Sequence, residues 1–375
     1  MIEENVPIRI AVVMGKYVTG GIKSVILNYY TAIDKEKFQF DLIVDKDSAD
    51  KDYIEFTSQG ANVHEVTPIN KNPIKNIFDV QKILKANKYG IVHGYLNTLN
   101  IFPMFAGFLA GTKVRIAENL STSHPKEPKT FFKNLLKPVG KMFATHLAAN
   151  SEYAAEWLYG KKELENVKIL RNGLDLNNYR YDFEMREKRR KELHIPDGTF
   201  VIGHIGRYQF QKNHSFLIDI FREIHTKKSD TILLLIGYGE LKEEIWIKIK
   251  EFGLEECVID GGGSVDNVAY YNLMDCFVLP SYYEGLPVVG IEAQATGLPC
   301  VFSSEITRET ALIKPVTFVS LEETADAWSE QILRFKEFNR LDTRNELSES
   351  GYNIKTEANS LELFYNSLLK QSIID

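Results

Sequence analysis

Short apolar segments alternate with helical segments along most of this chain, and that alternation restricts the fold more than any other feature of the sequence. Strands that alternate with helices in this way form parallel sheets covered by helices, so the chain is predicted to be an α/β protein. The apolar segments that we expect to be strands are 9–14, 40–44, 63–66, 91–93, 114–117 and 146–149, then 200–204, 231–236, 257–260 and 276–279.

The chain has 375 residues, which is enough for two domains with separate cores. Between the two series of strands, the segment 180–192 is crowded with Arg, Lys and Glu. Such a composition favours an exposed, charged helix that carries the chain from one domain to the next. We therefore expect one domain over residues 1–175 and a second over residues 176–356.

Composition excludes several classes of protein. Hydrophobic residues make up 44% and charged residues 26%, as in ordinary soluble domains, and the net charge of −6 argues against nucleic acid as the main partner. The cysteines, Cys257, Cys276 and Cys300, lack metal-ligand spacing, which favours reduced thiols in a cytoplasmic protein. The first residues lack the basic and apolar regions of a signal peptide, and no apolar run approaches the roughly 20 residues that span a bilayer. We expect a cytoplasmic protein that is not integral to a membrane.

The stretch from Asp275 to Cys300 predicts a strand, a loop and a helix. The apolar run 276–279 ends at Pro280, Pro287 is well placed to begin a helix, and Gly297 is well placed to end it. A loop of this kind lies at the carboxyl edge of a parallel sheet, where α/β proteins bind their ligands.

Two carboxylates flank the start of that predicted helix. Glu284 lies in the loop, and Glu292 lies within the helix. The backbone N–H groups after Gly285 are expected to form an anion site, because the first amides of a helix have no partner within it. One carboxylate could then reach the reacting end of a ligand bound at this site, and the other could reach a group further along the same ligand.

A cationic cluster follows the predicted strand 200–204. Gly206-Arg207 is followed five residues later by Lys212-Asn213. Arg offers planar bidentate donors and Lys a mobile point charge, and the pair suits a diphosphate. Without Glu284 and Glu292, two exposed cations would be the simpler interpretation.

Glu284 and Glu292, within Ser-Tyr-Tyr-Glu-Gly-Leu-Pro-Val-Val-Gly-Ile-Glu-Ala, resemble the E-x7-E signature of the retaining glycosyltransferases of family 4 (glycosyl transferases group 1). By analogy with members of that family, the resemblance implies a role in bacterial exopolysaccharide or capsule assembly. The resemblance implies a GT-B fold, with two Rossmann-like domains that face one another across a cleft. It also implies that 1–175 is the acceptor side, that 176–356 binds the donor, and that a helix over 357–375 packs back on the first domain.

The resemblance also implies roles for individual residues. Glu284 would contact the donor sugar near the reaction, and Glu292 would hold the ribose hydroxyls. The donor-binding set that it implies is Arg207, Lys212, Gly285, Leu286, Val288 and Glu292 with the first-loop glycines Gly20 and Gly21. Gly237-Tyr238-Gly239 would line the nucleoside pocket.

The resemblance also raises the question of a catalytic histidine. Family members often carry one directly after the strand that here is 114–117. This chain has Glu118 at that place and His124 six residues later. His124 is a candidate catalytic residue, and an ordinary surface histidine is the alternative.

The predicted activity is that of a retaining, metal-independent hexosyltransferase, with a nucleotide-diphosphate sugar, UDP-sugar foremost, as co-substrate and no other cofactor. The expected acceptor is a glycan, in particular a lipid-linked intermediate. An inactive donor-binding partner subunit and a nucleotide-sugar epimerase are the alternatives, and an oxidoreductase is a weaker one because the first loop lacks a dinucleotide fingerprint.

Lys129, Lys133, Lys137 and Lys141 repeat every four residues, which on a helix would form one cationic stripe, although Pro138 would kink it. One hypothesis is that this stripe contacts the anionic inner face of a membrane, where a lipid-linked acceptor would lie. The alternative is a solvated helix face.

Overall fold

The computed structural model describes residues 6–18, 20–123, 134–263 and 267–374. The chain divides into two compact units, which are described separately below. Unit 1 comprises residues 1–175 and 351–375, and unit 2 comprises residues 176–350.

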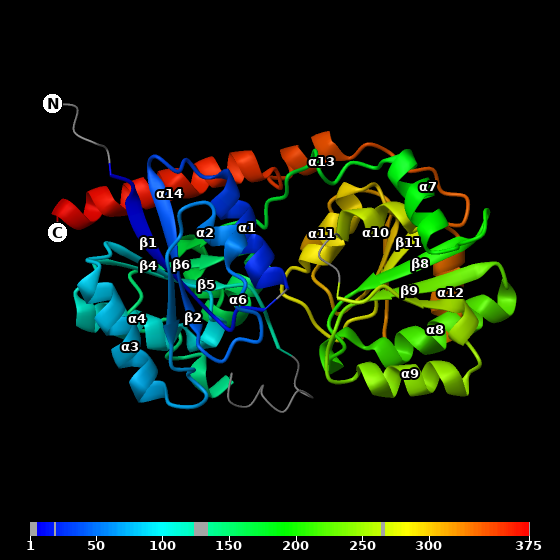
Figure 1. Ribbon diagram of the computed structural model, residues 1–375, viewed down its shortest axis with the longest axis horizontal. Helices are drawn as coiled ribbons and strands as arrows, with labels where there is room; N and C mark the ends of the chain where they lie inside the picture. The colour runs from blue at the N-terminus through cyan, green and yellow to red at the C-terminus, as the bar shows by residue number, and fades with distance from the viewer. Residues whose placement is uncertain (1–5, 19, 124–133, 264–266, 375) are drawn as a thin grey trace. The chain divides into compact units, whose positions relative to one another are not determined.

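Unit 1 is built on a parallel sheet (Figure 1). Its strands are β1 (Ile8–Gly15), β2 (Phe38–Asp45), β3 (Val63–Val66), β4 (Ile91–Gly94), β5 (Val114–Asn119), β6 (His146–Ala149) and β7 (Val167–Ile169). Its helices are α1 (Gly21–Ala32), α2 (Ile54–Thr57), α3 (Pro73–Ala86), η1 (Asn97–Asn100), α4 (Ile101–Ala110), α6 (Glu152–Tyr159), η2 (Lys161–Asn166) and α14 (Ile354–Ile374). The strand order is β3-β2-β1-β4-β5-β6-β7, with every pair parallel.

Local sequence signals account for several helix ends in unit 1. Asn72 caps α3 by accepting a hydrogen bond from Lys75 N at 2.9 Å, and Pro73 follows as the first helical residue. Ser151 caps α6 by accepting from Ala154 N at 3.1 Å, and Gly160 ends that helix with φ 84°. Helix α6 therefore begins and ends at residues that local sequence signals favour.

The last helix, α14, packs against the sheet of unit 1. Tyr365 in this helix is fully buried, and its ring lies 5.8 Å from that of Phe38 in β2. The Tyr365 hydroxyl lies 2.9 Å from Nδ1 of His93 in β4. Residues more than 250 positions apart in the sequence thus share one core.

Unit 2 repeats the same plan. Its strands are β8 (Phe200–Ile205), β9 (Thr231–Ile236), β10 (Val258–Asp260), β11 (Cys276–Leu279), β12 (Cys300–Ser303) and β13 (Val316–Val319). Its helices are α7 (Phe183–Glu192), η3 (Phe210–Lys212), α8 (His214–Lys227), α9 (Lys242–Glu251), η4 (Glu255–Cys257), α10 (Asn267–Leu273), α11 (Val288–Ala295), η5 (Arg308–Thr310), α12 (Ala325–Leu333) and α13 (Arg344–Glu349). The parallel sheet has the order β10-β9-β8-β11-β12-β13, so the α/β prediction is confirmed in both units.

The charged helix α7 differs from its prediction. Arg190 is buried, and both Arg186 and Arg190 form ion pairs of 2.6 Å with Asp275, which immediately precedes β11. Asp275 also accepts a hydrogen bond from Val201 N at 2.7 Å. The expectation of a simply exposed helix was wrong, because composition cannot show that these guanidinium groups face the partly buried carboxylate of Asp275.

Candidate active site

The loops after β8 and β11 lie side by side, because these two strands are parallel neighbours and end at the same edge of the sheet. Tyr282 N donates a hydrogen bond to Gln211 O at 2.9 Å, and Asn213 Nδ2 donates to Pro280 O at 3.1 Å. The rings of Phe210 and Tyr282 stack with centroids 4.5 Å apart. These contacts hold the cationic cluster of one loop beside the carboxylate of the other.

Glu284 is held from both sides by the neighbouring loop. Lys212 Nζ lies 2.7 Å from one carboxylate oxygen, and Gln211 Nε2 donates to the other at 3.0 Å. The side chains of Lys212 and Glu284 are only 14% and 8% exposed. Shielding from water strengthens this ion pair, so both charges are fixed in position before any ligand arrives.

The stem of Lys212 crosses the face of Gly206. A Cβ on Gly206 would lie 2.9 Å from His204 Nε2 and 3.1 Å from Lys212 Cδ, so only glycine leaves room for the lysine there. Burial lowers the pKa of His204 to about 3 and that of the adjacent His214 to about 2. Both imidazoles are therefore neutral at physiological pH, and Lys212 supplies the positive charge.

Arg207 lies in the same loop and is exposed. Its guanidinium forms no ion pair or hydrogen bond with the residues that the structure describes. A cation at the edge of the sheet without a structural partner is available to a ligand.

Backbone N–H groups line the start of α11. Within the described residues, the amides of Gly285, Leu286, Val288 and Val289 donate no hydrogen bond, and Pro287 between them has no N–H. Gly285 and Leu286 are buried. Unpaired buried amides are rare in proteins, and at the start of a helix they form an anion site.

Glu292 lies within α11 and is 4% exposed. Tyr179 donates a hydrogen bond to one carboxylate oxygen at 3.0 Å, and Tyr271 donates to the other at 2.8 Å. Burial raises the pKa of Glu292, and hydrogen bonds from Tyr271, Tyr179 and Asn267 oppose that rise. Each carboxylate oxygen has two lone pairs, so Glu292 can still accept further hydrogen bonds from a ligand's hydroxyls.

The loop after β9 packs directly on the loop after β8. A Cβ on Gly237 would lie 2.0 Å from Gly206 O, and a Cβ on Gly239 would lie 2.5 Å from Tyr208 O. Leu241 N completes the contact by donating to Tyr208 O at 3.1 Å. The Gly-x-Gly motif thus has a packing role that the sequence analysis did not predict, since sequence does not show which loops meet.

Gly237→Ala is expected to destabilise the protein by about 2–4 kcal/mol, because the new methyl group meets backbone and φ is +151°. Gly253→Ala is the matched control, since its φ is +64° but nothing lies within 4 Å of its Cβ. It should cost about 1–2 kcal/mol, the strain of the left-handed conformation alone. Urea unfolding of both variants measures the difference, and equal losses would contradict this account.

Two of the candidates in unit 1, Gly20 and Gly21, follow β1 in the other sheet. Gly20 and Gly21 form the junction between the β1 loop and α1. Gly20 has φ 153°, and a Cβ added there would have no atom within 4 Å. His124 lies outside the described residues. Glu118 is buried, and one of its carboxylate oxygens lies 2.9 Å from Nε2 of His93. A carboxylate in this contact belongs to the core of the unit.

Four side chains of this site were not predicted from the sequence, namely Gln211, Tyr179, Asn267 and Tyr271. Gln211 directly precedes Lys212, so its place in the cationic loop was the available signal. Tyr271 lies in α10, 21 residues before Glu292, and nothing in the sequence links the two. Only the packing of α10 against α11 brings its hydroxyl to Glu292.

The predicted cationic stripe is not one helical face in the described part of the chain. Lys129 and Lys133 lie outside it, and the helical conformation at 134–136 gives way to turns at 137–143. Lys137 lies 3.7 Å from the ring centroid of Trp157, and Lys141 pairs with Glu163 at 2.6 Å. The proline-containing segment breaks the helix, so the four-residue repeat does not produce a continuous face.

No group of three or more His, Cys, Asp and Glu side chains is placed to hold a metal ion among the residues that the structure describes. None of the helices in the described ranges has the length and apolar character needed to span a bilayer.

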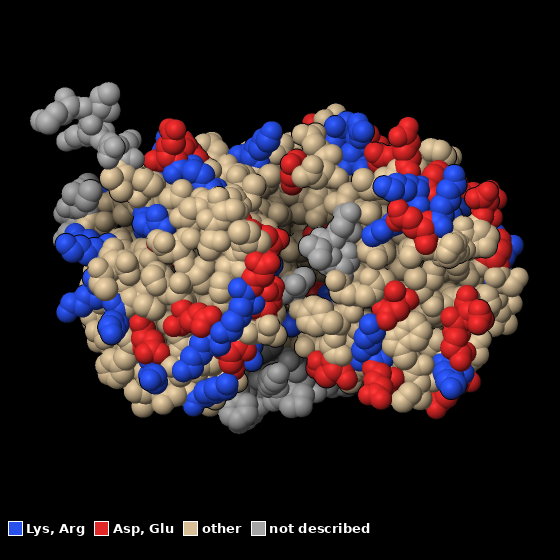
Figure 2. All heavy atoms as spheres, viewed as in Figure 1, with Lys and Arg blue, Asp and Glu red and all other residues tan. Residues whose placement is uncertain are grey.

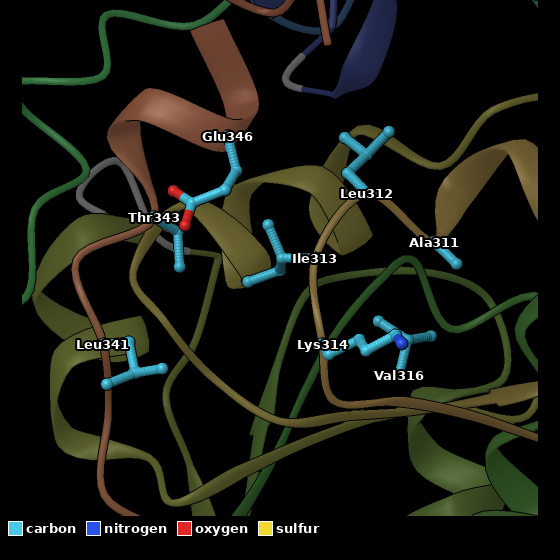
Figure 3. A pocket seen from close by; sticks show the side chains of 8 residues that line it. All are labelled: Ala311, Leu312, Ile313, Lys314, Val316, Leu341, Thr343 and Glu346. Carbon is cyan, nitrogen blue, oxygen red and sulfur yellow. The ribbon is translucent and has the colours of Figure 1, made fainter. Parts of the chain in front are cut away.

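A pocket of about 520 Å³ lies elsewhere in unit 2, around residues 311–316 and the segment that leads into α13 (Figure 3). Apolar side chains such as Leu312 and Ile313 line it, and Glu346 lies beside Thr343 at its polar side. Thr343 Oγ1 donates to Gln294 O at 2.8 Å, which ties this wall to α11. None of the predicted site residues lines this pocket.

Comparison with known sequences agrees with the geometry. The family described as "Glycosyl transferases group 1" matches residues 185–354. The Bacillus subtilis (strain 168) protein EpsF, named as a glycosyltransferase, is 30% identical over 92% of this chain and 93% of its own length. The Escherichia coli UDP-Gal:alpha-D-GlcNAc-diphosphoundecaprenol alpha-1,3-galactosyltransferase is 25% identical over 82% of each chain.

Comparison with solved structures gives the fold. The crystal structure of Anabaena HepE in complex with UDP and glucose matches with a TM-score of 0.73, at 18% identity over 97% of this chain and 98% of that one. A likeness at this identity carries the fold alone, and it confirms the predicted GT-B class.

Proposed function

Because this chain belongs to the glycosyl transferases group 1 family, we propose that it moves a hexose from a UDP-sugar to a lipid-linked glycan, with retention of anomeric configuration. HepE has been crystallised with UDP, and the name of the E. coli relative includes both a UDP-sugar and a diphosphoundecaprenol acceptor. These names support a UDP donor and a lipid carrier. By the same resemblance, assembly of exopolysaccharide or capsule is the expected setting.

The observation that carries the proposal is the run of unpaired amides at Gly285, Leu286, Val288 and Val289 beside the ammonium of Lys212. A leaving diphosphate gains negative charge as its bond to the sugar breaks. Fixed N–H donors and a fixed cation stabilise that charge without reorganising. The site is therefore suited to a reaction with a diphosphate leaving group.

The other side chains then take distinct roles. Arg207 would bind the diphosphate from the exposed side of the loop, and Glu292 would accept hydrogen bonds from both ribose hydroxyls. Glu284, adjacent to Lys212, would face the sugar and stabilise the positive charge that develops at its anomeric carbon. This arrangement divides binding from chemistry between the two glutamates.

The proposed transfer takes place in one step, without a covalent intermediate between the sugar and the enzyme. The acceptor hydroxyl oxygen bonds to the anomeric carbon on the face from which the diphosphate leaves. The bond from that carbon to the phosphate oxygen breaks, and the departing phosphate oxygen takes the acceptor's proton. The products are the glycosylated lipid-linked acceptor and UDP.

Thermal shift in the presence of UDP, GDP and inorganic diphosphate tests the donor, because a ligand that binds only the folded state raises the unfolding temperature. We expect the largest shift with UDP. Transfer of label from a panel of UDP-hexoses to a diphosphoundecaprenol-linked sugar then tests the reaction. No shift with UDP and no transfer from any donor would contradict the proposal.

The pH dependence of UDP binding should report on Glu292. Its carboxylate must be ionised to accept two hydroxyl donors, and burial raises its pKa. As the pH is lowered, UDP binding should therefore begin to weaken at a pH above the ordinary pKa of a glutamate. Tyr271→Phe removes a hydrogen bond to the charged form and should raise that pKa further. Loss of binding should then begin at a higher pH than in the wild type.

Titration calorimetry at a series of pH values measures this shift. Tyr270→Phe is the matched control, because Tyr270 lies on the same helix but donates its hydroxyl hydrogen bond to Gly261 O. Coincident pH profiles for Tyr271→Phe and Tyr270→Phe would contradict the assignment of Glu292.

A further inference from the structure

Helix α4 of unit 1 carries no polar side chain, although one face of it reaches the surface. It buries Pro103, Met104, Ala106 and Gly107 against the unit. Phe108 is 52% exposed and Leu109 is 40% exposed. Surface helices of soluble domains normally carry polar residues on their outer face, so this exposed apolar face requires an explanation.

Neighbouring segments extend the apolar surface. Ile74 and Phe78 lie one turn apart on α3 and are 67% and 59% exposed. Helix α3 lies beside α4 (Figure 1), and Gln81 Nε2 donates to Leu109 O at 3.3 Å. On the other side of α4, the ring of Phe108 lies 5.3 Å from that of Phe143, whose neighbour Met142 is 46% exposed. We define the α3–α4 face as the exposed side chains of Ile74, Phe78, Phe108, Leu109 and Met142.

Lysines border this face. Lys75, Lys82 and Lys85 are exposed on α3, and at helical spacing Lys75 and Lys82 flank Phe78. None of the three forms an ion pair with the described residues. The only acidic residue of α3, Asp79, accepts a hydrogen bond from Thr67 N at 3.0 Å, and the charge of Lys75 acts on this carboxylate without forming an ion pair with it. In Figure 2, lysine and arginine side chains lie among uncharged surface in the region of these helices, and some acidic side chains lie there too.

We propose that the α3–α4 face docks on an anionic lipid bilayer. Exposed Phe, Ile and Leu side chains suit the boundary between headgroups and acyl chains, and unpaired lysines around them complement anionic headgroups. The protein's net charge is −6, so this local positive charge runs against the overall balance. Docking would bring the enzyme to the surface that carries its substrate, and this last point rests on the proposed lipid-linked acceptor.

Co-sedimentation with vesicles of phosphatidylcholine alone, and of phosphatidylcholine with phosphatidylglycerol, tests the proposal without any donor. The full chain should bind the anionic vesicles more tightly, and less so at high salt. Lys75→Gln, Lys82→Gln and Lys85→Gln should each weaken that binding by about fivefold, since a lysine near an anionic surface contributes on the order of 1 kcal/mol. A Phe78→Ser/Phe108→Ser variant should weaken it further, on both kinds of vesicle.

The matched controls are Ile247→Ser on α9 and Leu363→Ser on α14, which remove exposed apolar side chains of 56% and 63% exposure outside this face. Both should bind vesicles as the wild type does. The UDP thermal shift of every variant checks that the fold is intact and separates failure here from failure of the proposed donor. Equal binding to neutral and anionic vesicles, or an equal loss in the controls, would overturn the proposal. So would a dimer in light scattering that only Phe78→Ser/Phe108→Ser dissociates, since the face would then be an interface between copies.

Discussion

Glu284→Gln is expected to slow sugar transfer by about 10²- to 10³-fold while UDP binding is kept or strengthened, if Glu284 stabilises charge in the transition state. Glutamine retains an oxygen for Lys212 and a similar shape, so the loop should keep its geometry. The variant loses the negative charge that faces the sugar. It also releases Lys212 from its ion pair, which leaves the ammonium freer to bind a diphosphate.

Steady-state kinetics with a saturating UDP-hexose, together with the UDP thermal shift, measures the two effects separately. Glu240→Gln is the matched control, because Glu240 is an exposed glutamate in the neighbouring loop after β9. It should change neither quantity. A Glu284→Gln variant that loses UDP binding but turns over normally at high donor concentration would reverse the role assigned to Glu284.

Glu292→Gln is expected to weaken UDP binding by about 10²-fold or more and to abolish the thermal shift. An ionised carboxylate that accepts two ribose hydroxyls contributes about 1.5–3 kcal/mol for each hydrogen bond, and a neutral amide contributes less. Glutamine is preferred to alanine here, because alanine would leave the hydroxyls of Tyr179 and Tyr271 without their acceptor.

Inorganic diphosphate separates this effect from a general loss of the site. It has no ribose, so Glu292→Gln should bind it as the wild type does, whereas Lys212→Ala should lose both ligands. Calorimetric titration of each variant with UDP and with diphosphate gives the comparison. Equal loss of UDP and diphosphate in Glu292→Gln would show that Glu292 supports the fold of the site and does not contact the nucleoside.

A repeat of lysines at 129, 133, 137 and 141 suggested a membrane-binding face, but Lys137 and Lys141 have partners in Trp157 and Glu163. The apolar face on α3 and α4 was present in the same sequence. Its exposure could not be predicted, because an apolar helix in an α/β protein is normally buried.

The sequence by itself determined the fold class and the family. Short apolar strands that alternate with helices leave parallel α/β architecture as the expected solution, and the Glu284-to-Glu292 signature in its strand, loop and helix setting pointed to one family. Local signals such as Ser151 and Gly160 also set helix ends, because capping acts between residues close together in the chain.

Only the tertiary structure decided which distant groups meet. The Lys212–Glu284 ion pair depends on β8 and β11 being neighbours in the sheet, although 72 positions separate the two residues. The tyrosines on Glu292 and the close contact of Gly237 with Gly206 O likewise join separate segments. Strand order and helix packing arise from burial summed over a whole unit, and so no local pattern in the sequence could reveal these contacts.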